Sequence, residues 1–155
     1  MNKACPISEA DQRLRNALVE IERPMLMEQS VKSIETNLIS GRYLISFPRA
    51  ALGPGPSRKL RNLLEMLGAP DSGIARLDQM QSSSQSVHLG FEPDPKSVLF
   101  KCYLEFSPHN RPHPNLTFIA LKWDAEGRNA VTLYQDRDNL SLSEQSRLVQ
   151  DIMPD

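Results

Sequence analysis

The chain has no long hydrophobic run, few cysteines and no marked excess of either charge. Its apolar stretches are much shorter than the ~20 residues that a helix needs to cross a membrane. The first residues, MNKACPISEADQ, lack the apolar segment of a secretory signal. We therefore expect a cytosolic protein with no membrane span.

Charge and cysteine content exclude two further classes of protein. The 18 Lys and Arg residues nearly balance the 19 Asp and Glu residues, which leaves a net charge of -1. A protein that binds nucleic acid needs a basic surface to neutralise phosphates, so we expect no nucleic-acid partner. The two cysteines, Cys5 and Cys102, are interpreted as reduced thiols and not as a disulfide framework.

The length and composition are those of one packed domain. With 155 residues, 39% hydrophobic and 24% charged, the chain can bury a core and is not globally disordered. We predict a flexible tail at residues 1–7 and a single domain over 8–155.

The first part of this domain has apolar residues at helical spacing. The predicted helical region covers residues 8–40, with a break at Pro24 and an end at Gly41. Two apolar stripes support it: Leu14, Leu18, Ile21 and Met25, then Met27, Val31, Ile34 and Leu38.

The remainder predicts a sheet with one inserted helix and a final helix. Residues 42–135 contain alternating segments typical of strands at 42–48, 87–92, 98–106, 116–123 and 130–135. A helix is predicted to begin at Pro56, a loop to cover 71–85, and a last helix to cover 141–153. This order indicates an α+β fold, an antiparallel meander of about five strands covered by helices. Either the helices cover one face only, or a second copy completes the sheet as a homodimer.

The stretch VLFKCYLEF, residues 98–106, has the clearest alternation. Its odd-numbered neighbours Lys101, Tyr103 and Glu105 share one face with Leu99, while the other face is entirely apolar. One interpretation is a solvated sheet face, with Lys101 paired to Glu105 or to an acid on a neighbouring strand. The other is a binding site, because a lysine ammonium suits a phosphate and a tyrosine ring stabilises a cation.

The Lys-x-Tyr pattern in FKCYLEF resembles the strand motif of the aromatic prenyltransferases of the ABBA type. The resemblance implies a helix-wrapped antiparallel barrel in which Lys101 binds an isoprenoid diphosphate and Tyr103 shields the allylic cation. Members of that family are about twice this length, so this chain would supply half of such a barrel.

Other residues enter through the same resemblance. The segment LKWDAEGRNAVTLYQ is similar to a second such hairpin, which makes Lys122 and Tyr134 substrate-binding candidates. Arg42, at the start of the predicted strand over 42–48, would match an arginine near the start of the family's sequences and is a further substrate-binding candidate. Glu105, the second catalytic candidate beside Tyr103, or Glu92 would orient an aromatic acceptor.

The histidines predict no metal site. His109 and His113 flank prolines that prevent the helix on which a four-residue spacing would form a metal-binding pair. His88 alternates away from its apolar neighbours and is a substrate-binding or acid–base candidate. We predict a cofactor-free protein that binds a small diphosphate and an aromatic compound. The alternative is a non-catalytic module that binds a small ligand or a protein.

Overall fold

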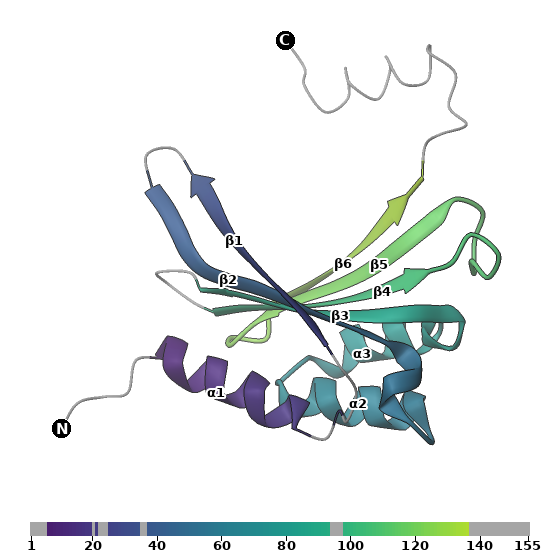
Figure 1. Ribbon diagram of the computed structural model, residues 1–155, viewed down its shortest axis with the longest axis horizontal. Helices are drawn as coiled ribbons and strands as arrows, with labels where there is room; N and C mark the ends of the chain where they lie inside the picture. The colour runs from purple at the N-terminus through teal and green to yellow at the C-terminus, as the bar shows by residue number, and fades with distance from the viewer. Residues whose placement is uncertain (1–5, 20, 22–24, 35–36, 94–97, 137–155) are drawn as a thin grey trace, which may run out of the picture.

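The computed structural model describes residues 6–19, 21, 25–34, 37–93 and 98–136 (Figure 1). Within them six strands form one sheet in chain order, and each strand is antiparallel to its neighbour. The predicted α+β antiparallel meander is confirmed, with an open sheet and not a closed barrel. The elements are α1 (Pro6–Leu18), β1 (Leu26–Ile34), β2 (Asn37–Pro48), η1 (Arg49–Leu52), α2 (Pro56–Met66), α3 (Asp71–Asp78), η2 (Gln81–Ser83), β3 (Ser84–Pro93), β4 (Val98–Phe106), β5 (Leu116–Asp124) and β6 (Asn129–Gln135).

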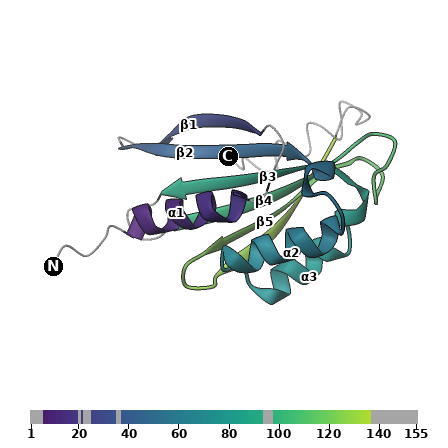
Figure 2. The ribbon, with the colours of Figure 1, turned by 60° about the horizontal axis from the view of Figure 1, so that its bottom comes forward.

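All three α-helices lie on one face of the sheet, as Figures 1 and 2 show. The core fills the layer between them. On β4 every second residue is buried, which follows the predicted alternation residue by residue. Cys102 and Leu104 are completely buried in this layer, whereas Lys101 and Tyr103 lie on the opposite face and are partly exposed. Among the described residues, the helices therefore leave the second face of the sheet uncovered.

The predicted helical region over 8–40 is wrong beyond α1. That helix begins at Pro6, inside the predicted tail, and ends at Leu18. The second apolar stripe belongs to the hairpin of β1 and β2. Met27, Val31 and Leu38 are 46%, 61% and 74% exposed. These apolar side chains are exposed on an outer hairpin and do not form a buried face. Their spacing in the sequence happens to match that of an apolar helix stripe, which explains the predicted helix.

The predicted loop over 71–85 is also wrong, because it contains α3, η2 and the start of β3. Only Ile74 and Leu77 provide large buried side chains on α3, too few to show a period in the sequence. Gly73 lets the helix approach the sheet, since a Cβ there would lie 2.5 Å from Leu121 Cδ1. The predicted break at Pro24 and the predicted helix at 141–153 lie outside the described residues.

Two polar contacts, one partly buried and one buried, attach α1 and α2 to the sheet. The Tyr43 hydroxyl of β2 donates a hydrogen bond to Asp11 of α1 at 2.5 Å. The Trp123 indole of β5 donates to the Leu67 carbonyl at the end of α2 at 3.2 Å. Both donors are thereby satisfied within the core. In the described part of the chain, every helix is too short or too polar to cross a membrane.

The two faces of β4 should respond differently to a charge. Cys102 is fully buried, and burial raises the pKa of its thiol to about 12. We expect Cys102→Asp to unfold the domain, because a carboxylate there has neither water nor a counter-charge. Lys122→Asp, on the exposed face of β5, is the control and should keep a cooperative unfolding transition in urea. Equal stability of the two variants would show that the faces are wrongly assigned.

Candidate functional site

Strand register brings the polar residues of the uncovered face into adjacent rows. Ser46, His88 and Tyr103 lie opposite one another across β2, β3 and β4. The next row along the strands contains Gly90 of β3 and Lys101 of β4, directly opposite each other. Two residues along a strand span roughly 6.6–7 Å, so the two rows are close enough to contact one ligand.

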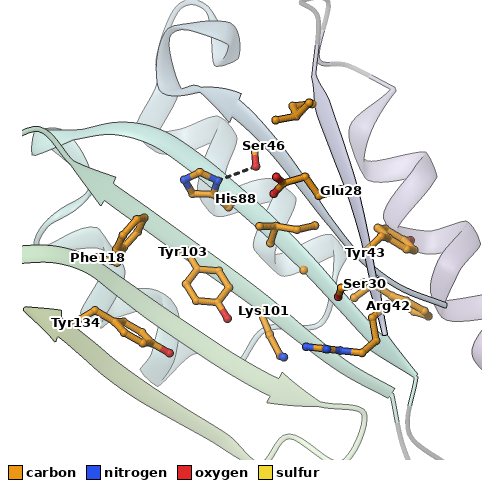
Figure 3. Close-up of a pocket in the computed structure, with 14 residues that line it drawn as sticks. Glu28, Ser30, Arg42, Tyr43, Ser46, His88, Lys101, Tyr103, Phe118 and Tyr134 are labelled. Atoms are coloured by element: carbon orange, nitrogen blue, oxygen red, sulfur yellow. Dashed lines mark hydrogen bonds between the residues drawn. The ribbon is translucent and has the colours of Figure 1, made fainter. Parts of the chain in front are cut away.

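These rows form the floor of a pocket of about 650 Å³ that extends from β1 to β6 (Figure 3). Gly90 has no side chain and so leaves space on the pocket floor. A Cβ at this position would lie only 3.2 Å from the Cβ of Lys101. The side chains that define the pocket include Leu26, Glu28, Ser30, Arg42, Leu44, Ser46, His88, Lys101, Tyr103, Phe118 and Tyr134.

One end of the pocket is built around the carboxylate of Glu92, which is 6% exposed. Lys101 and Lys32 each donate a hydrogen bond to it, the latter at 2.9 Å, and Arg42 Nε lies 3.3 Å away. Lys101 therefore pairs with an acid on the neighbouring strand, as the solvated-face interpretation expected. The cluster has three positive charges for one negative charge.

The ionised form of Glu92 is strongly favoured. Burial acts to raise its pKa, but the hydrogen bonds from Lys101 and Lys32 and the charges of Lys101 and Arg42 lower it to about 2. Arg42 Nε is buried and makes no hydrogen bond. Figure 3 shows Arg42 and Lys101 pointing toward one another at the pocket wall. Arg42 and Lys101 of this cluster line the pocket, which Glu28 also lines, while Lys32 contacts Glu92 from outside the lining.

His88 lies at the other end of the pocket with two polar partners. Its Nδ1 is 2.8 Å from Ser46 Oγ, a contact drawn in Figure 3, and its Nε2 is 3.2 Å from Glu105 Oε2. The three side chains come from β2, β3 and β4. They form a chain of hydrogen bonds that ends at a pocket-lining hydroxyl.

Aromatic rings line the side of the pocket nearest β6. Phe118 and Tyr134 meet edge to face with centroids 6.5 Å apart, and Tyr103 lies 6.2 Å from Tyr134. Burial, with smaller effects of Tyr134 and Glu92, raises the pKa of Tyr103, so its hydroxyl keeps its proton. This side of the pocket suits an apolar or aromatic group.

Most of the residues singled out in the sequence meet in this pocket. Arg42, His88, Lys101, Tyr103 and Tyr134 line it. Glu105 reaches it through His88, and Lys122 is opposite Lys101 in the register but outside the pocket lining.

Several contributors are not singled out by the sequence, among them Lys32, Ser46 and Phe118 and the lining residues Leu26, Glu28, Ser30 and Leu44. Lys32 was placed in a predicted helix, and its contact with Glu92 joins residues 60 positions apart. Ser46 had one available signal, its position between the apolar residues Ile45 and Phe47 of a strand. Phe118 was not distinguished from its apolar neighbours.

Comparisons with protein-family models, curated proteins and solved structures find no match for this chain. Among the described residues, no three His, Cys, Asp or Glu side chains are grouped so that they could hold a metal ion.

Glu92 should contribute to stability in a pH-dependent way. Its pKa falls on folding from the ordinary value of 4.5 to about 2, which corresponds to ~3 kcal/mol. We expect Glu92→Gln to lower the free energy of unfolding by up to this amount at pH 7. Because the folded pKa is the lower one, the contribution is complete above pH 4.5 and is lost as pH falls toward 2.

Urea unfolding of both proteins between pH 7 and pH 2 measures this difference. Glu65→Gln is the control, since Glu65 pairs with Arg61 on an exposed helix surface and should change stability by less than ~0.5 kcal/mol. A Glu92→Gln effect that did not decrease with pH would contradict the assignment.

Proposed function

We propose that the protein binds a small molecule that joins an anionic group to an apolar or aromatic part. The observation that carries the proposal is the surplus of positive charge around Glu92 at one end of an aromatic-lined pocket. A solvated sheet face has no need to bury one carboxylate among three cations. An anion that joined this cluster would neutralise its remaining charge.

The two ends of the pocket would fix the orientation of such a ligand. Its anionic group would contact Lys101 and Arg42, and its apolar part would lie against Tyr103, Phe118 and Tyr134. Lys101 is the best-placed cation, because its side chain is only 13% exposed and it lines the pocket. Charge-assisted hydrogen bonds are stronger in such a partly dehydrated site than at an open surface.

Aromatic prenyl transfer in the cytosol is the specific activity that we propose for this pocket. An isoprenoid diphosphate has both the required anion and the required apolar chain. The support is the resemblance of FKCYLEF to the ABBA motif together with the positions of its residues. Lys101 would hold the diphosphate, the Tyr103 ring would stabilise the allylic cation, and Glu105 would act on an aromatic acceptor through His88.

Lys101→Ala is the decisive variant for the binding proposal. We expect its affinity for geranyl diphosphate to fall about tenfold or more in calorimetry, because one charge-assisted contact is lost. The fold should persist, since Glu92 keeps Lys32 and Arg42 as partners. Lys122→Ala is the matched control, a lysine opposite Lys101 in the register but outside the pocket lining.

Two further ligands test the anionic and the apolar contacts of the proposal separately. Geraniol tests the apolar wall without the anion, and inorganic diphosphate tests the cations without the chain. Both should bind more weakly than geranyl diphosphate. If the wild type binds none of the three, or if Lys101→Ala binds as well as the wild type, the proposal is wrong.

A second candidate function is assembly with another copy of the chain. It is favoured by exposed apolar residues on the two outer strands, Leu26 and Val31 on β1 and Leu133 on β6. No residue of β6 is charged, so this outer strand lacks the usual protection against pairing with another strand. Light scattering of the purified chain decides the matter, because a monomeric mass at high concentration would exclude it.

A further inference from the structure

Ser46, His88 and Glu105 form a chain of hydrogen bonds that ligand binding at the cation cluster does not require. The contacts are 2.8 Å from Ser46 Oγ to His88 Nδ1 and 3.2 Å from His88 Nε2 to Glu105 Oε2. They join a hydroxyl, an imidazole and a carboxylate in the order that activates a serine nucleophile.

The direction of the hydrogen bonds follows from the chemistry of the three groups. The Glu105 carboxylate can only accept, so His88 Nε2 carries the proton and donates it. In the neutral ring Nδ1 then has a free lone pair, and the Ser46 hydroxyl donates to it. His88 is thereby the base for the Ser46 proton, while Glu105 holds the ring in the required tautomer.

Within this hydrogen-bonded chain, Ser46 Oγ is the atom placed to contact a ligand in the pocket. Both ring nitrogens of His88 are already engaged, so the imidazole has no nitrogen free to contact a ligand directly. Ser46 lines the pocket, and Figure 3 shows its hydroxyl beside the His88 ring. The ring also lies 6.0 Å from Phe118, which limits its rotation.

We propose that Ser46 is a nucleophile and that the pocket hydrolyses carboxylic esters. Ser46 Oγ forms a bond to the ester carbonyl carbon as its proton passes to His88 Nδ1. The bond to the alcohol oxygen breaks, and the alcohol leaves with that proton. Water then attacks the acyl-serine, gives a proton to His88, and releases the acid as Ser46 recovers its hydrogen. The reaction needs no oxidant, reductant or additional reactant.

The pocket also defines the class of ester. The row of Lys101 lies roughly 7 Å along the strands from the row of Ser46, and β4 lies two strand spacings, roughly 9.6 Å, from β2, so the two residues are roughly 12 Å apart. A substrate that contacts both would carry an anionic group about this far from its ester carbonyl. Its apolar part would lie against Phe118 and Tyr134. This activity is separate from prenyl transfer and does not depend on a diphosphate.

A fluorophosphonate probe tests the nucleophile directly. Attack by Ser46 breaks the phosphorus–fluorine bond, releases fluoride and leaves one phosphonyl group on the protein. We expect mass spectrometry to place this adduct on Ser46 in the wild type and to find none there in Ser46→Ala. Ser57→Ala is the matched control, because Ser57 lies on α2 outside the pocket lining, where its hydroxyl accepts a hydrogen bond from Arg49.

The role of the base is tested by the rate of labelling. His88→Gln should slow the labelling of Ser46 about 100-fold, the usual size of a general-base contribution. Glu105→Gln should slow it less, since the base itself remains. Thermal melting of each variant checks its fold. The rate of p-nitrophenyl butyrate hydrolysis should also decrease more in His88→Gln than in Glu105→Gln.

Two results would overturn the proposal. One is a folded wild type in which Ser46 stays unlabelled at millimolar probe. The other is labelling of Ser46 at an unchanged rate in folded Glu105→Gln and His88→Gln. Labelling is measured on Ser46 itself and geranyl diphosphate binding by calorimetry, so failure of the diphosphate proposal and failure of this one give different results.

Discussion

The described part of the structure depends on one constraint: an antiparallel sheet whose three α-helices cover the same face. The alternation of each strand then divides its residues between a dry layer and an open one. Cys102 and Leu104 enter the dry layer, so Lys101 and Tyr103 must lie on the open face. A slip of one residue in register would exchange the two sets. The packing of the core thereby fixes the positions of the pocket residues as well.

Glu92 connects stability to binding within that open face. Its buried carboxylate needs cations, and Lys32, Arg42 and Lys101 come to it from three different strands. The same contacts keep the cations in place at the pocket wall without a ligand, which reduces the cost of ordering them when one binds. An incoming anion must share these cations with Glu92. On our proposal, the site would therefore favour ligands that carry more than one negative charge.

The pocket has two chemically different ends. Arg42 and Lys101 bring positive charge to one end. Ser46 and His88 lie one row along the strands from Lys101, and Glu105, their hydrogen-bonded partner, lies one row further. Aromatic side chains border both ends on the side of β5 and β6. One molecule of moderate length can contact the whole arrangement, which gives it a fixed orientation between the two ends.

The sequence by itself determined β4, β5 and α2, because their alternating or helical patterns reflect real burial. It also indicated β6, although no residue of that outer strand is buried. It also indicated which side of β4 would carry Lys101 and Tyr103. Only the tertiary structure decided that residues 26–48 form a hairpin, since Met27 and Val31 are exposed on an outer strand and imitate a helical stripe. The contacts of Lys32 with Glu92 and of Ser46 with His88 join residues 60 and 42 positions apart. Such pairs depend on strand order and register, which are set by packing of the whole sheet and leave no local pattern.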